Sequence, residues 1–184
     1  MKYGFLLVAC LLVQACQFPA YSTLKLYEKD GKLMGVLPLV NGKVLYRKMV
    51  NTEALPKEEV FRRARRWCVF AYRSAKDVLQ LVDKETGEII GKGYSIVEGH
   101  QIYHTIVIDV HEDSYEVVVR DLDFFVPAHI SSSPYISSTS ERHIALEQYN
   151  LGTERAVIEL FRGIDTDIAT TIKGLTDYVQ NPKP

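Results

Sequence analysis

Residues 55–93 read LPKEEVFRRARRWCVFAYRSAKDVLQLVDKETGEIIGKG, and this stretch decides the fold. Its first half predicts an amphipathic helix from Pro56 to about Arg73, because apolar side chains recur every three or four residues. Proline suits the first turn of a helix, where its missing N–H is no loss. The second half predicts a hairpin from Asp77 to about Val97, with a turn that ends at Gly87. A helix followed by a hairpin indicates a sheet with a helix packed on it.

The composition is that of one globular domain. The chain has 184 residues, of which 47% are hydrophobic and 24% are charged. A net charge of −1 gives no overall attraction to nucleic acid or acidic lipid, and the arginine run Arg62–Arg66 is interpreted as a solvated helix face. Of the three cysteines, only Cys68 follows the N-terminal segment. It lies in the apolar stripe of the predicted helix and is interpreted as an unreactive core residue.

The N-terminal segment, residues 1–22, is typical of a signal peptide. Its apolar run, Phe5 to Val13, is too short to cross a bilayer as a helix. Two endings of the signal stay open: ordinary cleavage would release a domain beginning at Thr23, whereas a lipobox-like motif would place a lipid on Cys16. Both predict an exported protein of a Gram-negative bacterium, in the periplasm or anchored to the outer membrane. Membrane contact would then come only through the signal or the lipid.

We expect residues 23–184 to form a single domain. Alternation within Thr23–Tyr27 and Leu33–Val40 predicts an N-terminal hairpin, and Lys43–Val50 predicts the next strand. Turn signals separate these segments, at Asp30-Gly31 and again after Val40.

Two further strands follow the hairpin of residues 77–97. Gln101–Val110 shows the clearest alternation of apolar and polar residues in the chain. Tyr115–Val126 returns antiparallel to it, and its alternation breaks near Val119–Asp121, which predicts a β-bulge.

The last part of the chain contains a serine-rich loop, residues 127–143, and a long amphipathic helix from Thr153 to about Val179. The loop is interpreted as a connector, and Gly163 would allow the helix to bend. After the N-terminal hairpin, the order is therefore strand, helix, four strands, helix. We predict an α+β fold in which a curved antiparallel sheet carries both helices on one face.

This order is the β-α-ββββ-α arrangement of TBP-like folds, and the sequence around the first helix resembles one bacterial family. Residues 63–93 are similar to the domain of unknown function 4468, whose members have a TBP-like fold and are typically exported proteins of Bacteroides-type bacteria. The matching residues are Arg65, Trp67, Ser74, Ala75, Val78, Gln80, Asp83, Gly87, Ile90, Gly91, Lys92 and Gly93. The resemblance extends over residues 35–126. It implies the fold and export, but no activity, cofactor or catalytic residue.

The histidines do not indicate a metal site. His100 and His104 share one face of an extended strand, whereas His111 points to the other, and no third ligand converges with them. His104 lies in the apolar row and is interpreted as a hydrogen-bonded core residue. No phosphate-binding loop or nucleophile motif occurs, so we predict no catalytic residue, metal or cofactor. A hydrolase that pairs His100 or His111 with Asp109 or Glu112 is the third of three hypotheses.

The first two hypotheses concern binding. If both helices cover one face of the sheet, the other face is free to contact a partner. The residues of the Gln101–Val110 strand that would lie on it are Gln101, Tyr103, Thr105, Val107 and Asp109. We therefore predict a binding module without catalytic activity, whose partner is an envelope protein or a small ligand, with the serine-rich loop as a second contact. The alternative is a small-molecule carrier with an apolar pocket between the sheet and the C-terminal helix.

Overall fold

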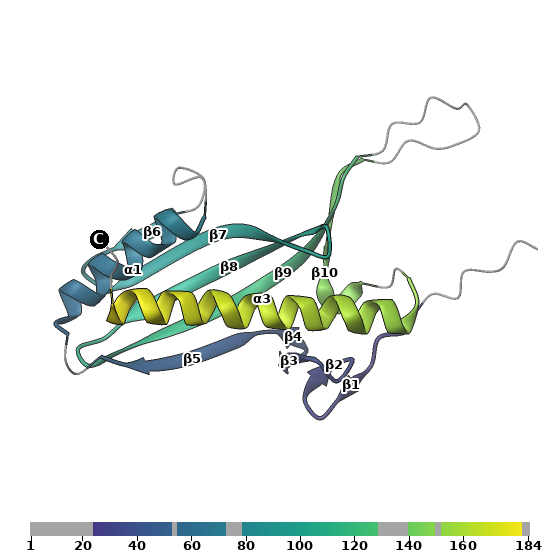
Figure 1. Ribbon diagram of the computed structural model, residues 1–184, viewed down its shortest axis with the longest axis horizontal. Helices are drawn as coiled ribbons and strands as arrows, with labels where there is room; N and C mark the ends of the chain where they lie inside the picture. The colour runs from purple at the N-terminus through teal and green to yellow at the C-terminus, as the bar shows by residue number, and fades with distance from the viewer. Residues whose placement is uncertain (1–23, 53–54, 73–78, 129–139, 150–151, 182–184) are drawn as a thin grey trace, which may run out of the picture.

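The structure is a computed structural model that describes residues 24–52, 55–72, 79–128, 140–149 and 152–181. An antiparallel sheet lies at its centre, and the two described α-helices, α1 (Lys57–Ala71) and α3 (Glu154–Gln180), lie on one face of it (Figure 1). The strand order is β10-β9-β8-β7-β6. Strand β5 pairs with the same edge of β9 as β10 does, but along a different part of that edge. The strands are β5 (Tyr46–Asn51), β6 (Leu79–Asp83), β7 (Glu88–Val97), β8 (His100–Val110), β9 (Ser114–Val126) and β10 (Arg142–Ala145). The predicted α+β class, an antiparallel sheet with a long C-terminal helix, is confirmed.

Helix α1 (Lys57–Ala71) forms where the sequence predicts it. Its apolar stripe is buried, and Cys68 is fully buried within that stripe. Burial raises the pKa of the Cys68 thiol to about 12, which keeps it protonated and confirms it as a core residue. The Arg63 guanidinium donates a hydrogen bond of 2.6 Å to the carbonyl of Val179. This bond joins α1 to the last turn of α3, the long C-terminal helix.

Helix α3 (Glu154–Gln180) begins at Thr153, whose side chain accepts a hydrogen bond from the amide of Ala156 at 3.3 Å. All apolar residues predicted for its stripe are buried, none with more than 6% of its surface exposed: Val157, Leu160, Phe161, Ile164, Ile168, Ile172, Leu175 and Val179. The helix continues through Gly163, where a bend was expected. Gly163 instead allows a close crossing with β7, because a Cβ there would lie 2.7 Å from the Val97 side chain.

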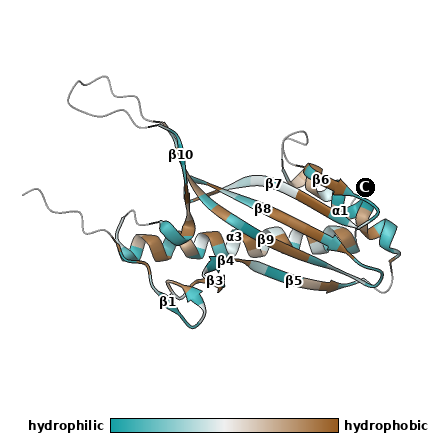
Figure 2. Cartoon of the chain, turned by 180° about the vertical axis from the view of Figure 1, so that it is seen from behind, coloured by the Kyte–Doolittle hydropathy of each residue, from teal (hydrophilic) through white to brown (hydrophobic). Residues whose placement is uncertain are grey.

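The sheet follows the predicted alternation. On β8, Ile102, Ile106, Ile108 and Val110 are buried beneath the helices. The predicted bulge in β9 is confirmed, because the register with β8 shifts between Tyr103 and Thr105, and Asp121 has a φ of 55°. Figure 2 shows the opposite face of β7, β8 and β9 without a helix over it.

The N-terminal region differs from the prediction of one hairpin. It forms a small four-stranded meander of β1 (Glu28–Lys29), β2 (Lys32–Leu33), β3 (Leu37–Val40) and β4 (Lys43–Val44). A second tight turn between β2 and β3 explains the difference, since Met34 and Gly35 both have positive φ. The expected strand Lys43–Val50 is also interrupted at Leu45, so that β4 joins the small sheet and β5 joins the large one.

The end of the predicted serine-rich loop is not a loop. Residues 142–145 form β10, which pairs with Asp123–Val126 of β9, and the 3-10 helix η1 (Leu146–Gln148) follows. Most of the loop, residues 129–139, lies outside the described residues, as do the signal segment and Cys16. Within the part of the chain that is described, no helix has the length and apolar character needed to cross a membrane.

Two glycines give opposite predictions for stability. A Cβ on Gly93 would overlap the Tyr72 ring, whereas a Cβ on Gly174 of α3 would meet only ordinary contacts. We expect Gly93→Ala to lower the free energy of unfolding by about 1–3 kcal/mol through overpacking. Gly174→Ala should raise it by about 0.5–1 kcal/mol because alanine favours helix. Urea denaturation of both variants tests this pair, and an equal effect of the two substitutions would contradict it.

Candidate functional site

An aromatic cluster lies on the uncovered face of the sheet, where β7, β8, β9 and β10 run side by side. It comprises Tyr94, Tyr103, Phe125 and His143, one residue from each strand. Tyr94 lies directly opposite Tyr103, and Phe125 lies directly opposite His143. The ring centroids of Tyr103 are 5.2 Å from Tyr94, 5.8 Å from Phe125 and 4.8 Å from His143. Such pairs contribute about 0.5–1.5 kcal/mol each beyond the area that they bury.

The aromatic cluster is accessible to a partner. Tyr94 is 49% exposed, and Ile96, two residues further along the same face of β7, is 66% exposed. His143 is exposed, while Tyr103 and Phe125 are half-buried. Aromatic and aliphatic surface of this kind, held in place by its own contacts, can bind an apolar surface with little loss of side-chain entropy.

The predicted face of β8 is only partly available. Gln101, Tyr103, Val107 and Asp109 point to the uncovered side and are partly exposed. Thr105 lies on the same side but is only 4% exposed, so its side chain cannot contact a partner.

Of the predicted residues, the structure brings only Tyr103 into the aromatic cluster. Sequence reasoning missed Tyr94, Phe125 and His143. The alternation of β7 would have placed Tyr94 on this face, and pairing with β8 would have placed Phe125 beside it. His143 gave no comparable signal, because it lies at the end of a serine-rich segment whose composition predicts a loop.

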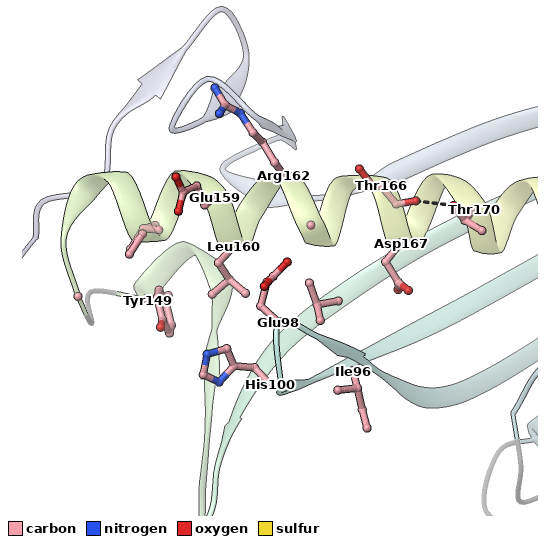
Figure 3. Close-up of a pocket in the computed structure, with 15 residues that line it drawn as sticks. Ile96, Glu98, His100, Tyr149, Glu159, Leu160, Arg162, Thr166, Asp167 and Thr170 are labelled. Carbon is pink, nitrogen blue, oxygen red and sulfur yellow. Dashed lines mark hydrogen bonds between the residues drawn. The ribbon is translucent and has the colours of Figure 1, made fainter.

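A groove of about 1140 Å³ lies on the other side of the sheet, around the tip of the β7–β8 hairpin and against α3 (Figure 3). Figure 3 shows Leu160, Tyr149 and His100 on one side of the tip, and Ile96 and Asp167 on the other. The groove lies at the margin of the helix–sheet interface.

The interior between helix and sheet is filled. Ile102, Ile164 and Ile168 are each at most 1% exposed. A filled interior argues against a carrier that encloses its ligand between these layers.

A buried polar pair lies beneath β7. The Tyr72 hydroxyl and His104 Nε2 are 2.7 Å apart, and His104 is only 3% exposed. Burial lowers the pKa of His104, and weaker effects of the Ile102 carbonyl and the Asp167 carboxylate oppose this shift. The imidazole is therefore neutral near pH 7, which confirms His104 as a hydrogen-bonded core residue.

The groups proposed for a hydrolase do not converge. His111 and Asp109 are close, with Nε2 and Oδ2 3.8 Å apart, but about half of each side chain is exposed to solvent. His100 lies on the opposite side of the sheet, with its ring centroid 4.9 Å from that of buried Phe124. Among the described residues, no group of three His, Cys, Asp or Glu side chains is placed to hold a metal ion.

The buried His104 predicts a pH dependence of stability. In the unfolded chain histidine binds a proton near pH 6.5, whereas native His104 does so only at lower pH. The unfolded state then holds more protons, so stability falls as the pH drops below about 6.5, by up to about 1.4 kcal/mol per pH unit.

We expect His104→Gln to flatten this slope, measured by urea denaturation between pH 7.5 and 5. The matched control is His111→Gln, which makes the same substitution at an exposed histidine and should flatten the slope less than His104→Gln does. The same slope in His104→Gln and the wild type would contradict the prediction.

Comparisons with known proteins agree with the fold. Residues 46–125 match the model of a family described as a domain of unknown function (DUF4468) with TBP-like fold. No curated protein matches the sequence.

Two crystal structures are similar in fold to most of this chain. A TBP-like protein from Parabacteroides distasonis ATCC 8503 is 18% identical, with a TM-score of 0.61 over 80% of this chain and 99% of its own. A DUF4468 family protein from Bacteroides ovatus ATCC 8483 is 15% identical, with a TM-score of 0.63 over 85% of this chain and 100% of its own. The resemblance to this family found in the sequence is thus confirmed as a match over residues 46–125, and the fold is TBP-like.

Proposed function

We propose that this chain is an exported binding module of the cell envelope, and that its aromatic cluster contacts a partner protein. The observation that carries the proposal is the position of the cluster: four rings from four strands lie together on the face that no helix covers. Aromatic residues are enriched in protein–protein interfaces and dominate their binding energy.

The surroundings of the aromatic cluster support a protein partner. Lys92 and Arg120 are exposed and flank Thr105 in the neighbouring strands, which places charged groups beside the rings. Arg120 also forms an ion pair of 2.7 Å with Asp121. An apolar centre bordered by solvated charges is the usual plan of a protein interface.

Nucleic acid is the less suitable partner. A net charge of −1 provides no general attraction to phosphates, and a TBP-like fold does not by itself imply DNA binding.

The proposed export rests on the signal-like residues 1–22. Either release at Thr23 or a lipid on Cys16 would place the module in the periplasm or at the outer membrane.

A photo-crosslinker in place of Tyr94 tests the proposal on intact cells. We expect it to crosslink one discrete envelope protein, because Tyr94 is 49% exposed on the uncovered face. A crosslinker at Ala169, on the exposed side of α3, should not reach this protein.

Competition separates specific from incidental capture. Added wild-type protein should suppress the crosslink. The Tyr103→Ala variant, added as competitor, should reach the same suppression only at a concentration at least about tenfold higher, as expected for an interface hot spot. The matched control is Met49→Ala, which removes an apolar side chain that is 57% exposed on β5, outside the cluster. Equal competition by Tyr103→Ala and the wild type, or equal crosslinking from Ala169, would refute the proposal.

A further inference from the structure

The second half of β7 has an edge that none of the described strands occupies, and we call it the free edge. Strand β6 pairs with β7 only from Glu88 to Gly91, whereas β8 pairs with β7 along its whole length, to Val97. Among the described residues, no strand lies along Lys92–Val97 on the side away from β8. In Figure 1, β6 accordingly covers only the part of β7 near α1.

The hydrogen-bond pattern shows which backbone groups this edge presents. The amide of Val110 donates to the carbonyl of Gly87 at 3.1 Å, so these two residues form a hydrogen-bonded pair. In an antiparallel ladder such pairs alternate, and the register between β7 and β8 contains no shift. Gly93, Ser95 and Val97 therefore bond to β8, whereas the N–H and C=O groups of Lys92, Tyr94 and Ile96 point to the free edge.

The edge lacks most of the usual protection against pairing. Natural edge strands are shielded by charged side chains, proline, bulges or a covering element. Between Tyr94 and Val97 there is no charge or proline, and both Tyr94 and Ile96 are large and exposed. A short apolar edge with free backbone groups is what peptides use when they add as a strand to a sheet.

The groove against α3 lies beside this edge and is acidic. Ile96 and Val97 belong to its lining together with Glu98 and Asp167. Figure 3 shows Asp167 pointing from α3 toward β7, while Arg162 points away from the groove. Asp167 Oδ2 is buried and has no hydrogen-bond partner in the described structure, and no ion pair involves either acidic residue. Asp167 as a whole is half-buried, so the groove presents an acidic side chain that forms no ion pair among the described residues.

We propose that the free edge of β7 binds an extended peptide with alternating basic and apolar residues, which adds to the sheet as a strand. Successive side chains of such a strand point to opposite faces. Basic side chains would enter the groove toward Asp167 and Glu98, and apolar side chains would lie beside Tyr94 and Ile96 on the uncovered face. This site shares Tyr94 with the aromatic cluster, but it is built on the backbone of β7 and does not depend on the contact proposed for the cluster.

The probe is a fluorescein-labelled peptide of sequence Lys-Val-Lys-Val-Lys-Val, and its binding is measured by fluorescence anisotropy. We expect saturable binding to the wild-type protein that weakens with added salt. A probe that is N-methylated on alternate residues, along the edge facing β7, should bind at least about tenfold less, because it cannot donate to the ladder. A Glu-Val analogue should bind at least as poorly, because its carboxylates would face Asp167.

Two substitutions at one position separate the backbone from the side chain. Ile96→Pro removes the N–H that points to the free edge and leaves the bonds to β8 intact, since proline is tolerated on edges. Ile96→Thr removes most of the apolar surface but keeps the N–H. We expect Ile96→Pro to lower the affinity for the probe at least about tenfold, and Ile96→Thr to lower it by no more than about threefold. Asp167→Asn should weaken binding and reduce its salt dependence, while Met49→Ala, an exposed position on β5 outside both sites, should leave it unchanged.

Three results would overturn the proposal: no binding of the Lys-Val probe, equal binding of the N-methylated probe, or equal binding by Ile96→Pro and Ile96→Thr. Circular dichroism of each variant checks its fold. If Ile96→Pro does not fold, the N-methylated probe still decides the question, because it is tested on the wild-type protein. A loss of probe binding in Tyr103→Ala would instead assign the peptide to the aromatic cluster.

Discussion

The packing of α3 across one face of the sheet is the constraint on which the rest of the structure depends. Its apolar stripe meets the inward side chains of the strands, and burial of each large aliphatic residue contributes about 1.5–3 kcal/mol. The helix can approach this closely because Gly163 has no side chain where it crosses Val97. Gly93 makes the same kind of space for the Tyr72 ring, which then reaches His104.

A two-layer fold leaves one face of its sheet without a cover, and this gives the molecule its candidate binding surface. Because α1 and α3 lie on the same face, the outward side chains of β7, β8, β9 and β10 are free of helices (Figures 1 and 2). The aromatic cluster lies on that face, and the free edge of β7 borders it. The two candidate surfaces thus share a strand and the Tyr94 side chain, but only the second uses the backbone groups of β7.

Much of this architecture could be predicted from local patterns. The periodicity of α1 and α3, the alternation of β8 and the bulge in β9 all follow from which residues must be buried. The small N-terminal sheet could not, because its strands are two to four residues long and carry too few side chains to show a period. Strand β10 was missed because its pairing with β9 depends on the partner strand and not on its own composition.

The sequence by itself determined the secondary structure of the domain's centre, its α+β class, and the faces of its strands, since burial imposes a period on the residues of each element. It also indicated Tyr103 as an outward residue. Only the tertiary structure decided that Tyr94, Phe125 and His143 surround Tyr103, that Thr105 is covered, and that no described strand pairs with the second half of β7 on the side away from β8. These properties depend on which strands become neighbours and in what register, and register is set by contacts between distant parts of the chain.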